Sequence, residues 1–205
     1  MNEIIWATPL YLFLKYCNES SLDKVILDCG AGGESPPLAL FYQYDYETNG
    51  IDISDKALEE SHLFCKENNI NLNITKGDMR KIPFEDESMS FVYSLDSIIF
   101  LSKDDTQIAI KEIERVLRTD GLCFINFKSI DDEDYNKGEP MGNNEFKLDN
   151  EWTEGEMVCS FYEDNEPDAY FGNFEILRKE KRIVDCFCIE NGHRIGYIDY
   201  IGRKK

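Results

Sequence analysis

The sequence predicts a doubly wound α/β fold of about seven mostly parallel strands, with helices on both faces and an antiparallel last strand. Short apolar runs alternate with amphipathic segments of about 10–15 residues from residue 24 onward, as crossover units between parallel strands require. A glycine-rich turn follows the first apolar run, at residues 30–33. The last two runs are separated by Glu190, Asn191 and Gly192, which predicts a closing hairpin.

The expected elements follow one another along the chain. The strands are residues 24–28, 46–52, 71–75, 91–95 and 122–127, and the helices are residues 9–18, 35–44, 54–69 and 104–118. Thr8 before Pro9 is expected to cap the first helix, and Ser54 the third, because a side-chain oxygen there accepts a backbone N–H. Polar side chains alternate through residues 71–75, so this strand is expected at an edge. The order is that of a Rossmann-like sheet.

An acidic insertion interrupts the pattern after the fifth strand. Residues 131–170 hold 14 acidic and two basic residues, a local net charge of 2 − 14 = −12. Residues 145–147 and 156–162 are expected to form a small hairpin inside it, and residues 174–188 and 194–201 to form the closing hairpin. We therefore expect a single domain over residues 1–205, in which residues 131–173 are a substrate cap.

The composition limits the function. With 41 Asp and Glu against 22 Lys and Arg, the formal charge is −19, so phosphate backbones are repelled and a nucleic-acid partner is not expected. Seven cysteines without a CxxC pair, and two histidines (His62 and His193), favour neither a disulfide framework nor a metal site. The apolar residues near the start are too few for a membrane span and lack the basic region of a signal peptide. We expect a cytoplasmic monomer or homodimer with reduced thiols and no membrane contact.

Acidic residues stand at the ends of three expected parallel strands. Asp28 ends the first strand, Asp52 ends the second, 20 residues after Gly32, and Asp78 follows the third. The carboxyl ends of parallel strands meet at one edge of a sheet, where open α/β proteins bind ligands. A glycine turn lets a ligand approach the backbone, and an acid at the position of Asp52 accepts hydrogen bonds from ribose hydroxyls. The pattern predicts a site for a cofactor that carries a ribose.

The chain resembles the class I S-adenosylmethionine-dependent methyltransferases, especially the small methyltransferase-domain type of bacteria and archaea. The matching stretches, which cover most of residues 24–128 in the family's order, are VILDCGAGG, NGIDIS, GDMRKIPFEDES, FVYSLDSIIFL and EIERVLRTDGLCFIN. The closing hairpin also fits this family. The sequence departs from the family pattern at Glu34, where a third glycine is common, and at Ser90, where an acid is usual.

The resemblance implies S-adenosyl-L-methionine as the cofactor and transfer of its methyl group as the reaction. The family's cofactor-binding positions correspond to residues at the ends of the first four strands, namely Asp28, Gly30, Ala31, Gly32, Asp52, Ile53, Asp78, Met79, Leu95 and Ser97. By this resemblance, Asp28 and the glycine turn hold the methionine moiety, Asp52 the ribose, and Asp78 the adenine amino group. Ser97 lies close to the sulfonium end.

An NAD-dependent oxidoreductase is the rival interpretation of this site. A GxGxxG fingerprint would need glycine at position 35, where the chain has Ser35. The pair Tyr11 and Lys15 imitates a dehydrogenase motif but precedes the glycine turn. Asp78 has no role in a dinucleotide fingerprint. Methyl transfer is therefore the favoured interpretation.

The acceptor is expected to be a small molecule, held by the first helix, the segment after the fourth strand and the insertion. The aromatic residues proposed to contact it are Trp6, Tyr11, Tyr16, Phe100 and Trp152. Asp96 is the candidate catalytic base, with a helix-capping role as the alternative. Because residues 131–134 are all acidic, a neutral or cationic acceptor is favoured over a polyanion, unless this run is solvated surface. A protein or RNA acceptor, or a non-catalytic binding role on the same fold, stays open.

Overall fold

In the part of the chain that the structure describes, seven strands form the central sheet and three more belong to the insertion. The computed structural model describes residues 7–149, 156–187 and 192–205, and its central sheet runs in the order β3-β2-β1-β4-β5-β10-β9. The strands are Val25–Cys29 (β1), Glu47–Asp52 (β2), Ile74–Lys76 (β3), Met89–Ser94 (β4), Leu117–Ser129 (β5), Phe174–Cys186 (β9) and His193–Lys204 (β10). Strands β1 to β5 are parallel, and β10 is antiparallel to β5 and β9. The predicted mostly parallel sheet with an antiparallel last strand is confirmed.

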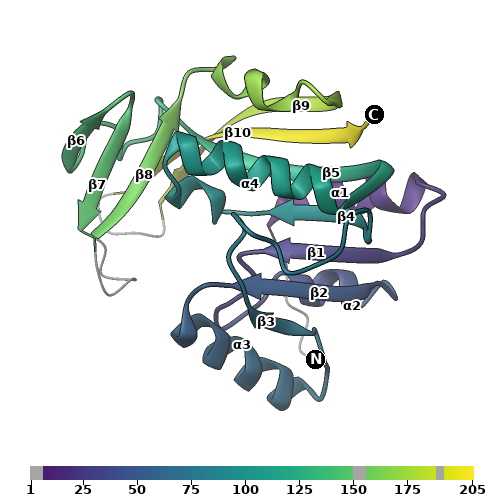
Figure 1. The fold of residues 1–205 in the computed structure, drawn as a ribbon. Coiled ribbons are helices and arrows are strands. Elements are labelled where there is room, and N and C mark those ends of the chain that lie inside the picture. The colour runs from purple at the N-terminus through teal and green to yellow at the C-terminus, as the bar shows by residue number, and fades with distance from the viewer. Residues whose placement is uncertain (1–6, 150–155, 188–191) are drawn as a thin grey trace.

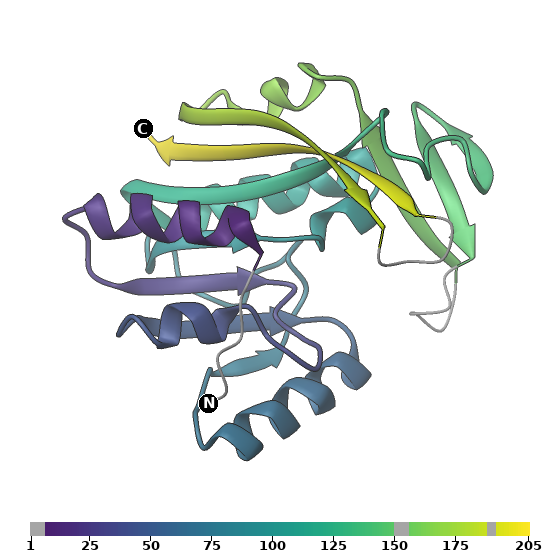
Figure 2. The same cartoon turned by 180° about the vertical axis from the view of Figure 1, so that it is seen from behind.

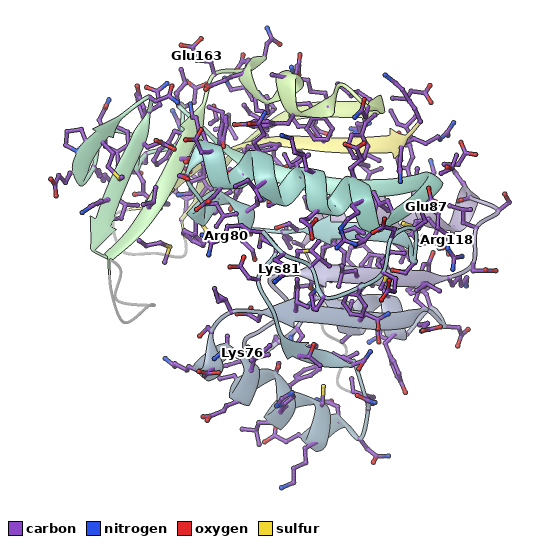
Figure 3. The ribbon with its side chains drawn as sticks, viewed as in Figure 1. Lys76, Arg80, Lys81, Glu87, Arg118 and Glu163 are labelled. Carbon is purple, nitrogen blue, oxygen red and sulfur yellow. The ribbon has the colours of Figure 1, made fainter. Side chains whose placement is uncertain are left out.

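The parallel strands all end on the same side of the sheet. In Figure 1 the arrowheads of β1, β2 and β4 point to the left, toward the insertion, and that of β10 points the other way. At the opposite end, Arg118 Nε donates to Glu87 O at 3.2 Å. Figure 3 shows these two residues far from Arg80, which lies at the carboxyl ends of the strands.

Helices cover both faces of the sheet, as predicted (Figures 1 and 2). They are Thr8–Glu19 (α1), Leu38–Tyr42 (α2), Asp55–Asn68 (α3) and Lys103–Val116 (α4), with 3-10 turns at Ile98–Phe100 (η1) and Glu166–Phe171 (η2). Side chains of α1, α2 and α3 share one apolar core with β1 and β4, whereas α4 packs into a second core with β4, β5 and η2. None of the described helices is long and apolar enough to cross a membrane.

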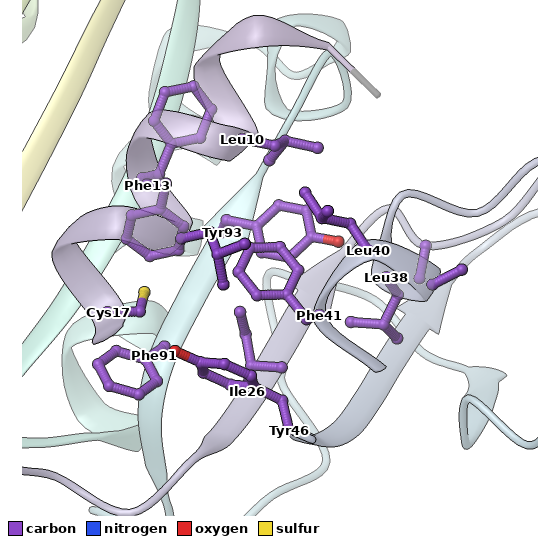
Figure 4. Packing of buried hydrophobic residues seen from close by; sticks show 14 of the residues in the cluster. Leu10, Phe13, Cys17, Ile26, Leu38, Leu40, Phe41, Tyr46, Phe91 and Tyr93 are labelled. Carbon is purple, nitrogen blue, oxygen red and sulfur yellow. The ribbon is translucent and has the colours of Figure 1, made fainter. Parts of the chain in front are cut away.

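Helix α1 lies on the sheet through its apolar side. Leu10, Phe13 and Cys17 are buried at helical spacing and face Phe41 and Tyr93 (Figure 4). The Phe13 ring lies edge-on to both aromatic rings, at centroid distances of 6.1 Å and 6.3 Å. The predicted helix is confirmed.

The predicted cap of α1 is wrong by one residue. Ala7 is the N-cap and makes no side-chain cap hydrogen bond, and Thr8 is already helical. Proline is tolerated at the second helical position as well as the first, because neither N–H has a partner within the helix. The predicted cap at Ser54 is confirmed, since its hydroxyl accepts from Ala57 N at 3.3 Å.

Two elements are shorter than predicted, for local backbone reasons. Helix α2 begins only at Leu38, because Ser35 and Pro36 each precede a proline and are biased away from helical dihedrals. Strand β3 begins at Ile74, because Asn73 has a left-handed φ of 54°. The edge position of β3 is confirmed, since it pairs with β2 alone in the part of the chain that the structure describes.

The insertion forms three strands where the sequence predicted two. They are Glu139–Gly142 (β6), Glu145–Asp149 (β7) and Glu156–Tyr162 (β8), and they pair antiparallel in that order. Strand β6 contains proline and glycine and is exposed throughout, so neither propensity nor alternation indicates it. The end of β8 pairs in parallel with the end of β5, at Phe161 and Tyr162. The insertion is thereby attached to the carboxyl end of the main sheet.

The closing hairpin also contacts the base of the insertion. Gly196 N donates to Asp132 Oδ2 at 3.0 Å, and the Asp132 side chain is fully buried. A Cβ on Gly196 would lie 2.8 Å from the backbone nitrogen of Asp132, which cannot move away freely. The predicted turn residues Glu190 and Asn191 lie outside the described residues.

We expect Gly196→Ala to lower the free energy of unfolding by about 1–3 kcal/mol, because the added methyl group meets backbone atoms of the insertion. Gly172→Ala is the matched control, since φ is −55° there and no atom lies within 4 Å of its Cβ position. Gly172→Ala should be neutral or stabilise by up to about 1 kcal/mol. Urea unfolding of both variants measures the difference, and equal stabilities would contradict the close contact.

Candidate active site

A cavity of about 490 Å³ opens at the carboxyl ends of β1 to β4. Each strand end contributes lining residues, in the spatial order of the strands: Asp78 and Met79 after β3, Asp52 and Ile53 at β2, Gly30 and Gly32 after β1, and Asp96 and Ser97 after β4. The volume lies in the range of small-molecule and cofactor sites. Seven of the ten residues predicted to bind the cofactor therefore lie around one cavity, and the other three lie behind it.

Those three residues support the cavity wall. Asp28 and Ala31 are buried, at 1% and 0% exposure, and Leu95 is half-buried against the core of α1 and α2. None of the three lines the cavity. These three residues can therefore contact a bound cofactor only through backbone atoms, or through side chains after a small opening of the turn.

The glycine turn lies flat against the neighbouring strand ends. Gly30 N and Ala31 N both donate to Ile51 O, at 2.8 Å and 3.0 Å. Gly30 has a φ of +105°, and a Cβ there would lie 2.0 Å from Ser97 Oγ. Position 30 therefore requires glycine for both its dihedral angle and its contact with β4.

Asp52 is fixed by two backbone donors. Its Oδ2 accepts from Gly32 N and its Oδ1 from Ser54 N, each at 2.9 Å. Each carboxylate oxygen has a further lone pair for a ligand hydroxyl. A Cβ on Gly32 would lie 2.7 Å from Asp52 Oδ2, so this glycine is needed for the carboxylate to approach the turn.

Arg80, which the sequence analysis did not single out, holds Asp78. The Arg80 side chain donates to both Asp78 oxygens, at 2.6 Å for the shortest contact, and to Asp105 Oδ2 of α4 at 2.9 Å. These hydrogen bonds lower the pKa of Asp78. Arg80 also lines the cavity, so an adenine amino group that binds Asp78 shares this carboxylate with a guanidinium. Arg80 belongs to the family-like stretch GDMR, but the sequence does not show that Asp105 of α4 lies beside it.

Asp28 is a buried acid with an unsatisfied oxygen. Its Oδ2 has no hydrogen-bond partner among the described residues, and neither do the buried Tyr93 hydroxyl and Ser90 Oγ. Burial raises the pKa of Asp28 to about 8. A cation beside this oxygen would favour the ionised form. Ser90, where the family usually has an acid, offers no charge here.

Asp96 adopts a left-handed backbone conformation and lines the cavity. It is exposed and has a φ of +54°, which Asp and Asn adopt more often than other residues with a Cβ. Its backbone N donates to Asn126 Oδ1 at 2.9 Å, and Asn126 Nδ2 donates to its Oδ1 at 2.5 Å. The helix-capping alternative does not hold, because η1 has no side-chain cap and Ile98 N donates to Ser94 Oγ.

The insertion contributes directly to the cavity wall. Met157 of β8 lines it together with Phe100 and Leu101 of the segment after β4. Ser160 Oγ donates to Leu101 O at 2.7 Å, and Lys103 N donates to Glu145 Oε1 at 2.5 Å. These bonds fix the insertion against the start of α4. Sequence analysis placed the insertion near the site but did not identify Met157.

The substrate-contact candidates are not all brought together. Phe100 lines the main cavity, whereas Tyr16 lines a separate one beside Asp120 and Arg203, at the other end of the sheet. Tyr11 is 37% exposed on α1 and lines neither cavity. Trp6 and Trp152 lie outside the described residues.

The acidic run at residues 131–134 is largely paired. Lys128 Nζ lies 3.3 Å from Asp132 Oδ1 and 3.1 Å from Asp134 Oδ2, and Lys181 pairs with Asp131. Asp132, Asp134 and His193 are the group of possible metal ligands among the described residues. The Lys128 ammonium already contacts both carboxylates of this group, and the group does not line the main cavity.

The fold is that of the class I S-adenosylmethionine-dependent methyltransferases. A structure of an S-adenosylmethionine-dependent methyltransferase from Methanosarcina mazei matches 98% of this chain and 99% of its own, at a TM-score of 0.76 and 18% identity. A Burkholderia thailandensis 1,6-didemethyltoxoflavin-N1-methyltransferase, with its acceptor and S-adenosylhomocysteine bound, matches 97% of this chain and 77% of its own, at a TM-score of 0.66 and 14% identity.

Residues 27–125 match the family model for a methyltransferase domain. S-adenosylmethionine is the cofactor that this family implies. An uncharacterised Haemophilus influenzae protein is 27% identical over 104 residues, which are 50% of this chain and 41% of that protein. The chain thus matches about two fifths of the length of this curated relative.

The residues present fit this cofactor. Asp52 is an anchored carboxylate of the kind that binds ribose hydroxyls, and Gly30 and Gly32 of the glycine turn line the cavity beside it. The unpartnered buried oxygen of Asp28 suits a cationic ammonium group nearby. When bound, S-adenosylmethionine supplies a methyl group on a sulfonium, already activated for transfer.

We expect Asp28→Asn to make the stability of the ligand-free protein less dependent on pH. Folded Asp28 keeps its proton up to about pH 8, whereas the unfolded chain releases it near 3.8, so wild-type stability falls as pH rises between these values. One such proton corresponds to about 1.4 kcal/mol per pH unit. Urea unfolding of both proteins at about pH 5.5 and pH 7.5 measures the two slopes. Equal slopes would contradict a protonated Asp28 in the folded state.

Proposed function

We propose that this protein transfers a methyl group from S-adenosylmethionine to a small-molecule acceptor. The observation that carries the proposal is the order of groups around the cavity. Two carboxylates, at Asp78 and Asp52, are followed by the glycine turn and then by a third carboxylate at Asp96. In S-adenosylmethionine, adenine, ribose and a sulfonium-bearing chain follow one another in the spatial order that these protein groups would recognise.

The proposed cofactor contacts follow this order. Asp78 and Met79 contact the adenine, with Ile53 against its face. Asp52 accepts from the ribose hydroxyls, and Gly30 begins the turn that borders the methionine moiety. This arrangement leaves the sulfonium beside the end of β4, where Ser97 and Asp96 line the cavity.

The acceptor is proposed to enter from the side of Asp96. Asp96 is the proposed base or cation-binding group, and Phe100 and Met157 supply apolar contacts. Orienting the acceptor nucleophile toward the methyl group is the main contribution of these residues, because the sulfonium needs no further activation. The Burkholderia neighbour, whose acceptor is a small heterocycle, supports a small-molecule acceptor here. Residues 131–173 are the proposed substrate cap.

A protein acceptor is the alternative, since the cavity is open to solvent beside Phe100, which is 37% exposed. An RNA acceptor is less favoured by the net charge of −19. A binding role without catalysis would keep the cofactor contacts and lack any methyl transfer.

We expect Asp52→Ala to weaken binding of S-adenosylmethionine by more than about 1 kcal/mol, or fivefold, because two ribose hydroxyls lose their acceptor. Asp55→Asn is the matched control, since the Asp55 side chain is 75% exposed, pairs with Lys76 and does not line the cavity. Calorimetric titration measures both affinities. Unchanged affinity in Asp52→Ala would contradict the cofactor pose, and competitive micromolar NAD binding would favour the oxidoreductase interpretation.

We expect label from methyl-tritiated S-adenosylmethionine to appear in a small-metabolite fraction rather than in protein or RNA. The reason is the size of the cavity, of which the insertion forms one wall. Incubation of the protein with separated metabolite, protein and RNA pools measures the distribution. Label in the protein pool alone would favour the alternative acceptor, and no transfer to any pool would favour a binding role.

A further inference from the structure

Three side chains from three strand ends meet beside the cavity. Asp96 follows β4, Asn126 lies on β5 and Tyr197 lies on β10. Asn126 is 0% exposed and binds both the backbone N and the Oδ1 of Asp96. The Tyr197 side chain neighbours Asp96, and burial together with the Asp96 charge raises the pKa of Tyr197, which keeps the phenol protonated.

The fixed carboxylate lies on the acceptor side of the cavity. The strand order places β5 and β10 beyond β4, on the side away from Asp52 and Asp78. Asp96 itself lines the cavity next to Ser97, whose hydroxyl lies 3.5 Å from Gly30 O. A cofactor that spans from Asp78 to Gly30 therefore ends beside Asp96.

Arg182, a cation near this cluster, is paired with another acid. The neighbouring Asp199 is paired with Arg182 at 2.9 Å, and the Arg182 guanidinium lies 4.3 Å from the centre of the Tyr197 ring. Among the described residues Asp96 makes no ion pair. Asn126 holds it instead, by donating to its carboxylate and accepting from its backbone N–H, and Tyr197 lies beside it.

We propose that Asn126 and Tyr197 are positioning residues that hold Asp96 toward the transferred methyl group. There Asp96 would bind an acceptor whose nucleophilic nitrogen or oxygen carries a proton, as in an amine or a hydroxyl compound. This inference rests on the proposed function and adds to it the class of acceptor.

The proton and electron changes in the transfer balance without a further reactant. The acceptor's lone pair forms the new bond to the methyl carbon, and the carbon–sulfur bond breaks with its electron pair going to sulfur, which becomes a neutral thioether. The proton of the nucleophile passes to the Asp96 carboxylate and then to water.

Sinefungin is a probe for this charge that requires no knowledge of the acceptor. In this analogue, a carbon bearing an amino group replaces the methyl-bearing sulfonium, so its ammonium lies where the methyl group is transferred. S-adenosylhomocysteine lacks any group at that point. The ratio of the two affinities, measured by calorimetry, therefore reports the interaction at the methyl position, while contacts to adenine and ribose cancel.

We expect the wild-type protein to bind sinefungin about tenfold more tightly than S-adenosylhomocysteine. In Asp96→Asn the ratio should fall to within about twofold, because the charge is lost. Asn126→Leu and Tyr197→Phe should each lower the ratio in part, since Asp96 keeps its charge but not its position. A merely structural role would weaken both ligands together and leave the ratio unchanged.

Tyr200→Phe is the matched control for Tyr197→Phe. Tyr200 lies on the same strand, but it packs in the second core and its hydroxyl donates to Asp168 of η2, so the ratio should stay at the wild-type value. A wild-type ratio near one, or a ratio that survives Asp96→Asn, would overturn the inference while the proposed function stands. A ratio that depends on Asp96 but survives both Asn126→Leu and Tyr197→Phe would overturn the positioning role. Failure of the wild-type protein to bind either ligand would instead contradict the proposed function, and the inference with it.

Discussion

The contact of the Gly30 turn with the ends of β2 and β4 is the constraint on which the rest of the site depends. Gly30 N and Ala31 N share the Ile51 carbonyl as acceptor, and a side chain at position 30 would overlap Ser97. The turn is thereby tied to both neighbouring strands of β1. Because the strand ends carry the recognition groups, this tie fixes the distances between those groups, and binding does not have to order them first.

The acceptor side is built by longer-range contacts on the same frame. Strand β8 joins the end of β5, and its Met157 reaches the cavity, while the base of the insertion is held to β10 through Asp132 and Gly196. Strand β10 in turn carries Tyr197 toward Asp96. The insertion and the hairpin therefore support each other beside the same cavity.

The sequence predicted those features that depend on local patterns. The succession of parallel strands and helices and the place of Asp52 follow from alternating apolar runs and from spacing relative to the glycine turn. The start of β3 was predicted too early, because a pattern of apolar residues does not reveal that Asn73 has a left-handed backbone. Asn126 and Met157 were missed because their partners lie 30 or more residues away, although a polar residue within the apolar run LCFINF was a usable signal. Tyr16 was misplaced because helical spacing gives its face but not which end of the sheet it borders.

The charge of the insertion has a different meaning in the structure from the one its composition suggests. The run at residues 131–134 is compensated by Lys128 and Lys181, and Asp132 is buried where it holds the hairpin, so these acids contribute to folding. Paired charges produce a weak field at a distance, because each cation cancels most of its partner's potential. Under the proposed function, a preference for a neutral or cationic acceptor would therefore depend on the carboxylate of Asp96, which lines the cavity. A net charge of −12 over 40 residues is thus a poorer guide to the acceptor than one carboxylate held beside the cavity by Asn126.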